Sequence, residues 1–321
     1  FFKSFFLLFF LVNLLNAESL TPTAKLVASG GVTDLVIQNN KLYAATTASS
    51  IDIFNLSTKE LEKRIILPKI TDFMGDIINS KVYSVDVIDD KVLILSQGEK
   101  GGRNIFIYEN EKLTTIIPDT KRLFIARAKF LDKNRVIYAL LSNQLFLYDI
   151  EKKKNIYFKQ ISQSKFSYFS LNENKESIVI ADESGNLKLL NTQNGELVKE
   201  YKNENLDNVF QTDFKNGKIL TAGQDRRSVF YSENKSYFKE SNFLIYSCAL
   251  NDKATLAAYS SNENNDVTIF DTNTKKDLIK LTGNSMTLTK IIFINDNEIL
   301  VSSDDKNINY YKGLKWTFQV L

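Results

Sequence analysis

The chain has 321 residues, of which 43% are hydrophobic and 25% charged, so it can bury a large core and is not an intrinsically disordered chain. Its 41 Lys and Arg residues are nearly balanced by 38 Asp and Glu residues, which argues against the basic face of a nucleic-acid-binding protein. The sequence contains no histidine, which excludes His-ligated metals, Ser-His-Asp and Cys-His nucleophile systems, and imidazole acid–base chemistry.

The N-terminal segment has the parts of a secretory signal peptide. Lys3 precedes an apolar stretch over residues 5–15, and a small residue, Ala17, precedes a polar segment. The apolar stretch is shorter than a helix that crosses a bilayer. We predict a signal peptide over residues 1–17, with an uncleaved membrane anchor as the alternative. Residues 18–321 are then a single periplasmic domain, expected to be monomeric and to have no membrane span after signal removal.

A strand pattern recurs along the rest of the chain. Its clearest part is an apolar strand ending in an aromatic residue or Leu, at positions 54, 108, 148, 190, 231, 270 and 311. The spacing is about 40 residues, the period of a four-stranded propeller blade, and is longer by about a dozen residues in the first interval. Each of these third strands follows a continuous apolar run, as expected for a strand covered on both faces. These second strands are predicted at 42–45, 92–95, 136–139, 178–181, 219–222, 256–259 and 299–302.

Tight turns precede the second strands in step with this pattern. Each turn contains Asn, Asp or Gly, which tolerate the left-handed backbone conformations of short hairpin loops. The turns are predicted at 39–40, 89–90, 132–134, 172–174, 216–217, 251–252 and 295–297. The sequence therefore predicts an all-β fold, a seven-bladed β-propeller with four antiparallel strands per blade.

Several third strands continue into an Asp or Asn, at Asn55, Asp149, Asn191 and Asp271, which resembles the Trp-Asp end of a WD40 repeat. The turns at 222–225 and 302–305 resemble the Ser-Gly-Ser-x-Asp turn of that family. The chain thus resembles the WD40/YVTN-like propellers, although it lacks their Gly-His pair and so their Asp-His-Ser/Thr-Trp hydrogen-bond ladder. Such propellers close by mixing strands from both termini in one blade. Residues 24–30 and 315–321 both read as the closing strand, and the sequence does not decide between them.

In the topology of this family, the loops from second to third strands and from fourth to first strands share one face. Basic residues gather there over blades two, three and five, and they are Lys100, Arg103, Lys121, Arg122, Arg226 and Arg227. Acidic residues gather over blades four, six and seven, and they are Asp182, Glu183, Glu263, Asp266, Asp304 and Asp305. This charge pattern indicates a docking face for a protein partner, because complementary charge steers encounter and fixes register. Ordinary solvated loop charge is the alternative.

The long first interval contains an insertion over residues 68–78, and insertions in repeat arrays map to loops, often on a binding face. Phe73 and Met74 are candidate partner anchors within it. They could equally pack against the disc as local core, which we consider the better prediction. The one cysteine, Cys248, lies in the apolar run 244–250 and is predicted to be a buried structural thiol.

No catalytic residue, cofactor site or metal site stands out, and the sequence favours a non-catalytic accessory protein with a periplasmic protein partner. The exported, WD40-like chain looks like the propeller accessory protein (the L component) of periplasmic nitrate reductase systems. That resemblance implies a role in maturation of the reductase or in electron-transfer coupling, without a cofactor of its own. The alternatives are a propeller hydrolase with an axial metal, such as calcium, and a scaffold of another envelope complex.

Overall fold

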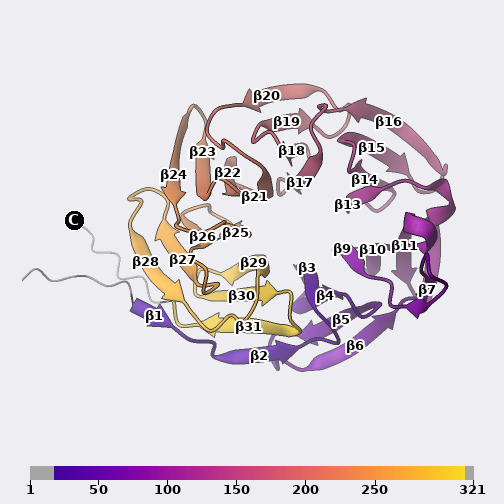
Figure 1. Cartoon of the computed structure of the whole chain (residues 1–321), viewed down its shortest axis with the longest axis horizontal. Coiled ribbons are helices and arrows are strands. Elements are labelled where there is room, and N and C mark those ends of the chain that lie inside the picture. Colours follow the sequence, from indigo (N-terminus) through magenta and orange to yellow (C-terminus); the bar gives the residue numbers. More distant parts are fainter. Residues whose placement is uncertain (1–17, 315–321) are drawn as a thin grey trace, which may run out of the picture.

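In the computed structural model, which describes residues 18–314, seven sheets form a closed ring around a central axis (Figure 1). This confirms the predicted seven-bladed β-propeller. Blade one consists of β3 (Val32–Gln38), β4 (Lys41–Thr46), β5 (Ser50–Asn55) and β6 (Leu61–Ile66). In blades one to five the first strand in chain order lies nearest the axis and the last lies on the rim. The predicted signal peptide and the C-terminal strand predicted at 315–321 lie outside the described residues.

The other blades repeat this arrangement of four antiparallel strands. Blade two contains β9 (Val82–Ile88), β10 (Lys91–Gln97), β11 (Arg103–Glu109) and β12 (Lys112–Ile117). Blade three contains β13 (Ile125–Asp132), β14 (Arg135–Leu140), β15 (Gln144–Asp149) and β16 (Lys154–Gln160). Blade four contains β17 (Phe166–Leu171), β18 (Ser177–Asp182), β19 (Leu187–Asn191) and β20 (Leu197–Tyr201). Blade five contains β21 (Val209–Lys215), β22 (Lys218–Gly223), β23 (Arg227–Ser232) and β24 (Lys235–Glu240).

The last two blades incorporate the N-terminal strands. Blade six contains β25 (Cys248–Leu250), β26 (Leu256–Ser260), β27 (Val267–Asp271) and β28 (Asp277–Leu281), and β1 (Glu18–Leu20) adds a fifth strand parallel to β28. Blade seven contains β29 (Leu288–Asn295), β30 (Glu298–Ser303), β31 (Asn307–Lys312) and, as its outer strand, β2 (Ala24–Val27). The N-terminal strand β2 therefore closes the ring, which the sequence left undecided.

Local sequence explains the strand pattern. The second strands are apolar throughout because they are covered on both faces; in β10 every residue from Val92 to Ser96 is buried. The turn residues Asn39 and Asn40 have positive φ values of 50° and 60°, as the hairpin requires. Hydrophobic clusters form between neighbouring blades: one unites Ile51 of blade one with Ile94 of blade two. Each blade is thus covered by the next.

Hydrogen bonds attach the closing strand to both neighbouring blades. β2 pairs antiparallel with β31, placing Lys25 opposite Asn309. Just beyond β2, the Ser29 amide donates to the buried Asp52 carboxylate at 2.6 Å, and the Ser29 and Ser50 hydroxyl groups are 2.6 Å apart. This network lies in blade one, so the N-terminal segment binds blade seven and blade one together. In residues 18–314 no helix has the length and apolar character needed to cross a bilayer.

Ring closure by β2 is tested by two neighbouring substitutions. Leu26 is 1% exposed and packs between blades seven and one, whereas Val27 is 51% exposed. Leu26→Ala should lower the free energy of unfolding by about 2–5 kcal/mol, as for other buried leucines. Val27→Ala, the matched control, should change it by less than about 0.5 kcal/mol. Urea unfolding measures both, and equal effects would contradict closure by this strand.

Candidate functional site

The inner strands surround a cavity of about 650 Å³ on the propeller axis. Its lining includes the last residues of the inner strands and the turns that follow them, such as Gln38, Ile88, Asn172 and Asp252. The cavity therefore lies at the end of the axis that carries the first-to-second-strand turns. This is the face opposite to the one on which the sequence placed the docking surface.

The floor of the cavity is built by a shared irregularity of the inner strands. In six blades the pairing of first and second strands shifts by one residue near the start of the inner strand. Such bulges redirect the side chain that follows them. The residues directly after the shift lie at one level of the ring, and they are Asp34, Ser84, Arg127, Tyr168, Gln211 and Lys290. All six are polar, so the bulges place a polar level across the axis.

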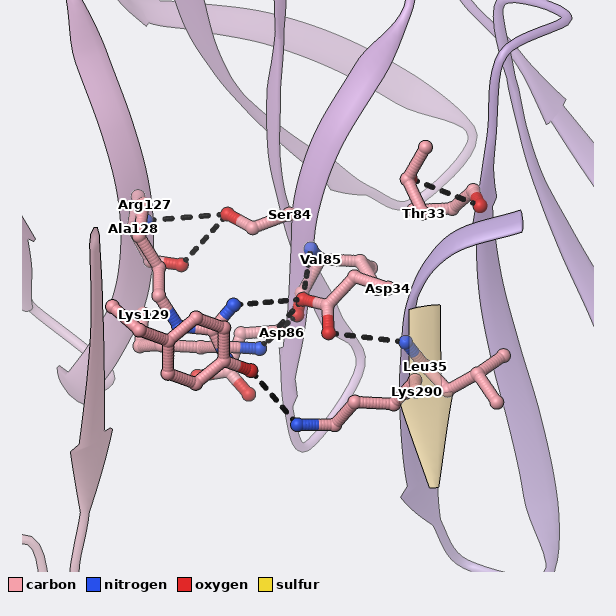
Figure 2. Close-up of polar contacts among 12 residues, drawn as sticks. Thr33, Asp34, Leu35, Ser84, Val85, Asp86, Arg127, Ala128, Lys129 and Lys290 are labelled. Carbon is pink, nitrogen blue, oxygen red and sulfur yellow. Dashed lines mark hydrogen bonds and ion pairs between the residues drawn. The ribbon is translucent and has the colours of Figure 1, made fainter. Parts of the chain in front are cut away.

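Asp34 is the centre of a buried charge cluster at this level (Figure 2). It is 2% exposed, and its Oδ2 atom lies 3.0 Å from Lys129 Nζ and 3.6 Å from Arg127 Nη1. The backbone amides of Leu35 and Val85 also donate to its carboxylate, at 3.1 and 3.2 Å. The carboxylate from blade one thus holds the inner strands of blades two and three.

Arg127 and Lys290 come from opposite sides of the same level and meet at Tyr168. The Arg127 guanidinium lies 3.9 Å from the centre of the Tyr168 ring, and its Nε donates to the Phe169 carbonyl at 3.0 Å. Lys290 Nζ donates to the Tyr168 hydroxyl at 2.8 Å. Three blades therefore bring two cations to one aromatic side chain.

The pKa shifts reveal how charge is distributed in the cluster. Burial alone would raise the pKa of Asp34, but Lys129, Arg127 and Lys290 outweigh it and lower that pKa to about 2. Burial lowers the pKa of Lys129 to about 8, and the nearby positive charges of Arg127 and Lys290 add to this effect although Asp34 opposes it. Asp86 also opposes the lowering of the Lys129 pKa. Three cations, Lys129, Arg127 and Lys290, therefore act on the one carboxylate of Asp34.

Two further carboxylates bridge neighbouring blades. Asp86 accepts a hydrogen bond from the Phe130 amide at 2.8 Å and lies 3.7 Å from Lys175 Nζ. Asp213 accepts from the Leu250 amide, also at 2.8 Å. These contacts join blade two to three and blade five to six. Within residues 18–314 no group of three or more Cys, Asp or Glu side chains is placed to hold a metal ion.

On the opposite face, the insertion forms a hairpin of β7 (Ile70–Thr71) and β8 (Ile77–Ile78). The prediction that Phe73 and Met74 pack as local core is wrong: they are 80% and 87% exposed. Asp72 accepts hydrogen bonds from the Met74 and Asp76 amides, so polar contacts fix the turn while both apolar side chains stay exposed.

Two short 3₁₀ turns adjoin this hairpin, η1 (Glu99–Gly101) and η2 (Asp119–Lys121). They lock together because Asp119 accepts from the Glu99 amide at 2.7 Å. A side chain at Gly102 would lie 2.4 Å from the Asp119 carbonyl oxygen, so only glycine permits this approach. A Cβ atom at Gly101 would lie 3.6 Å from Phe73 and 3.7 Å from Phe124, which is itself 54% exposed. We call β7–β8, η1, η2 and Phe124 the loop platform.

The structure brings some of the predicted partner-binding residues together and separates others. Lys100, Lys121 and Arg122 are exposed on the loop platform, which also includes Phe73 and Met74. Arg103 is half-buried instead: its guanidinium lies 3.9 Å from the centre of the Tyr83 ring, and its Nη1 donates to the Ile125 carbonyl at 2.6 Å.

The remaining residues of the predicted charge pattern lie apart from the platform. Arg226 is exposed in blade five, whereas the Arg227 guanidinium lies 4.3 Å from the centre of the Phe238 ring. Asp182, in the predicted acidic set, is buried and accepts hydrogen bonds from Asn143 and Ser162, so it holds blades three and four together. The contiguous part of the predicted docking face is therefore the loop platform.

The axial cluster was not predicted from the sequence, although the sequence contains a pattern that indicates it. A polar residue recurs near the start of the first strand in six of the repeats, as in Asp34, Arg127 and Lys290. Cys248 is buried as predicted, and burial raises the pKa of its thiol well above the ordinary value.

No protein-family model matches the chain, and no curated protein is similar to it in sequence. The fold and the two faces described above are therefore the basis for function.

The charge imbalance of the axial cluster predicts unequal effects of two substitutions. Asp34→Asn leaves three cations together and should lower the free energy of unfolding by about 3–5 kcal/mol at pH 7. Lys129→Met should cost less, because Arg127 remains beside Asp34. Urea unfolding of both variants measures this. A larger effect of Lys129→Met would contradict the excess of cations.

A comparison of the natural protein with Asp34→Asn also tests the pKa of Asp34. Because that pKa is lowered in the folded state, the carboxylate contributes fully to stability above its pKa in the unfolded chain. The contribution is lost as the pH falls from about 4 to about 2. The stability difference between the natural protein and Asp34→Asn should shrink over this range, and a constant difference would show that the pKa is not lowered.

Proposed function

We propose that the propeller is a non-catalytic accessory protein that binds a protein partner through the loop platform. The observation that carries this proposal is the exposure of Phe73, Met74 and Phe124 on loops that are themselves held in place. Large apolar side chains on a fixed surface are typical anchors of protein interfaces, because they gain most when a partner removes them from water. A rigid platform also limits the entropy lost on binding.

Charge around the platform indicates the kind of partner. Lys100, Lys121 and Arg122 are exposed there, while the carboxylates of Asp72 and Asp119 accept hydrogen bonds from backbone amides of the platform itself. Two exposed carboxylates, Asp76 and Glu99, also lie on the platform, so its three exposed cations outnumber them. We infer a partner with an acidic patch bordering an apolar pocket, since such a surface would be steered to the platform.

The cellular setting of this proposal is the periplasm, as the N-terminal segment of the sequence suggests. A monomeric propeller there would act by holding its partner and needs no cofactor of its own. The resemblance to the L component of periplasmic nitrate reductase systems makes the reductase the first partner to test, in its maturation or its electron-transfer coupling. A scaffold role in another envelope complex would use the same platform.

Substitutions on the two faces test the proposal. Phe73→Ser with Met74→Ser should weaken capture of the partner more than tenfold, because apolar anchors dominate interface energy. Lys121→Glu with Arg122→Glu should slow association, most strongly at low salt. The control is Lys152→Glu with Lys153→Glu, an equal charge change at exposed residues of the turn between β15 and β16, on the opposite face. Binding kinetics with the periplasmic reductase, and with envelope extract, measure these effects.

The variants change only exposed side chains, so their melting temperatures should match that of the natural protein and exclude unfolding as a cause. Equal capture by the natural protein and the Phe73/Met74 variant would overturn the platform as the binding surface. An equal loss with the Lys152/Lys153 variant would show that net charge, rather than the platform, governs capture.

A further inference from the structure

The floor of the axial cavity presents more hydrogen-bond donors than the described residues use. The Arg127 guanidinium has five N–H groups, of which the one at Nε donates a hydrogen bond within residues 18–314. The Lys290 ammonium has three donors, of which one is used, by the Tyr168 hydroxyl. Arg127 is 8% exposed and lines the cavity, and its Nη1 atom lies 3.6 Å from Asp34 Oδ2, beyond hydrogen-bond distance. Its guanidinium therefore has donors that are available to an acceptor in the cavity.

The charges on the floor of the cavity also favour binding of an acceptor with negative charge. Arg127, Lys129 and Lys290 all act on the single carboxylate of Asp34. Asp86 is paired with Lys175, and Asp213 accepts hydrogen bonds from backbone amides. Burial alone would lower the pKa of Lys290, but Tyr168, Asp34 and Asp213 outweigh it and raise that pKa, so the ammonium stays charged at neutral pH. Since Arg127, Lys129 and Lys290 share the carboxylate of Asp34, an anion bound beside Arg127 and Lys290 would further stabilise their charges.

Geometry suits an oxyanion in particular. Arg127 supplies a planar fork of donors and Lys290 a compact positive charge, and both line the cavity. Tyr168 orders both groups, since its ring stacks on the guanidinium and its hydroxyl accepts from the ammonium. Because the three residues belong to three different blades, closure of the ring fixes their separation. A carboxylate or phosphate group can thus bridge them with little rearrangement.

The rest of the cavity indicates a larger molecule than an inorganic ion. Its volume of about 650 Å³ is that of a small-molecule site. Between the floor and the mouth the lining includes Val36, Ile88, Leu171 and Ile292, which are only partly buried. These side chains offer apolar contact to the body of a ligand whose charged end lies on the floor.

We propose that the axial cavity binds a small organic anion, with its carboxylate or phosphate group between Arg127 and Lys290 and its apolar body toward the mouth. This site lies on the opposite face from the loop platform and does not depend on the proposed function. A ligand and a protein partner can therefore be bound at the same time.

Calorimetry and thermal unfolding with three probes test this site. Phenylacetate and phenyl phosphate share an apolar ring and differ in the oxyanion, while phenylacetamide is the uncharged isostere of the first. At matched ionic strength in chloride, at least one of the two anions should bind and raise the melting temperature, and the amide should not. The anion that binds with the higher affinity identifies the preferred head group. Equal effects of the amide and the anions, or no binding by either anion, would overturn the proposal.

Two variants and a control locate the bound group. Lys290→Met removes the ammonium and should lower anion affinity at least tenfold. Tyr168→Phe keeps the charge of Lys290 and should retain most of the binding, which separates loss of charge from general disturbance of the channel. Lys152→Met is the control, because that lysine is exposed in the turn between β15 and β16 and does not line the cavity. Undiminished binding by Lys290→Met would overturn the assignment, whatever its melting temperature.

Discussion

The pairing of β2 with β31 is the constraint on which the rest of the structure depends. It removes the free edge that blade seven would otherwise expose, and the Ser29 amide extends the connection to Asp52 in blade one. Once the ring is closed, each inner strand has a fixed position about the axis. Residues far apart in the chain, such as Asp34 and Lys290, then lie at one level because their strands are fixed at the same height around the axis.

Closure also explains how a charged axis is tolerated. The carboxylates of Asp34, Asp86 and Asp213 accept hydrogen bonds from backbone amides of the next blade, so each contributes to the contact between two blades. These hydrogen bonds therefore help to stabilise the contacts between neighbouring blades. Arg127 also bridges two blades, through the bond from its Nε to the Phe169 carbonyl, and Lys290 donates to the Tyr168 hydroxyl. The remaining donors of these two cations are the ones that we propose bind a ligand.

The sequence predicted the fold better than the sites, for physical reasons. Apolar runs and Asn, Asp or Gly turns are local signals, and they located the blades. Closure was undecided because residues 24–30 and 315–321 have equally good strand patterns, and only pairing across the ring distinguishes them. The exposure of Phe73 follows from hydrogen bonds that fix the hairpin turn, which hydrophobicity does not reveal. The axial cluster depends on strand bulges, which shift register without changing composition.

The two faces thus differ in chemistry: the loop platform offers exposed apolar and basic side chains, and the axial cavity offers buried donors. The account predicts that a protein partner and a small anion occupy opposite ends of the axis. Hydrogen–deuterium exchange of the protein, alone, with captured partner and with phenylacetate or phenyl phosphate, tests this most directly. The partner should protect β7–β8, η1 and η2, and the anion should protect the ends of the inner strands and their turns. Protection of the same face by both, or of the outer strands alone, would contradict it.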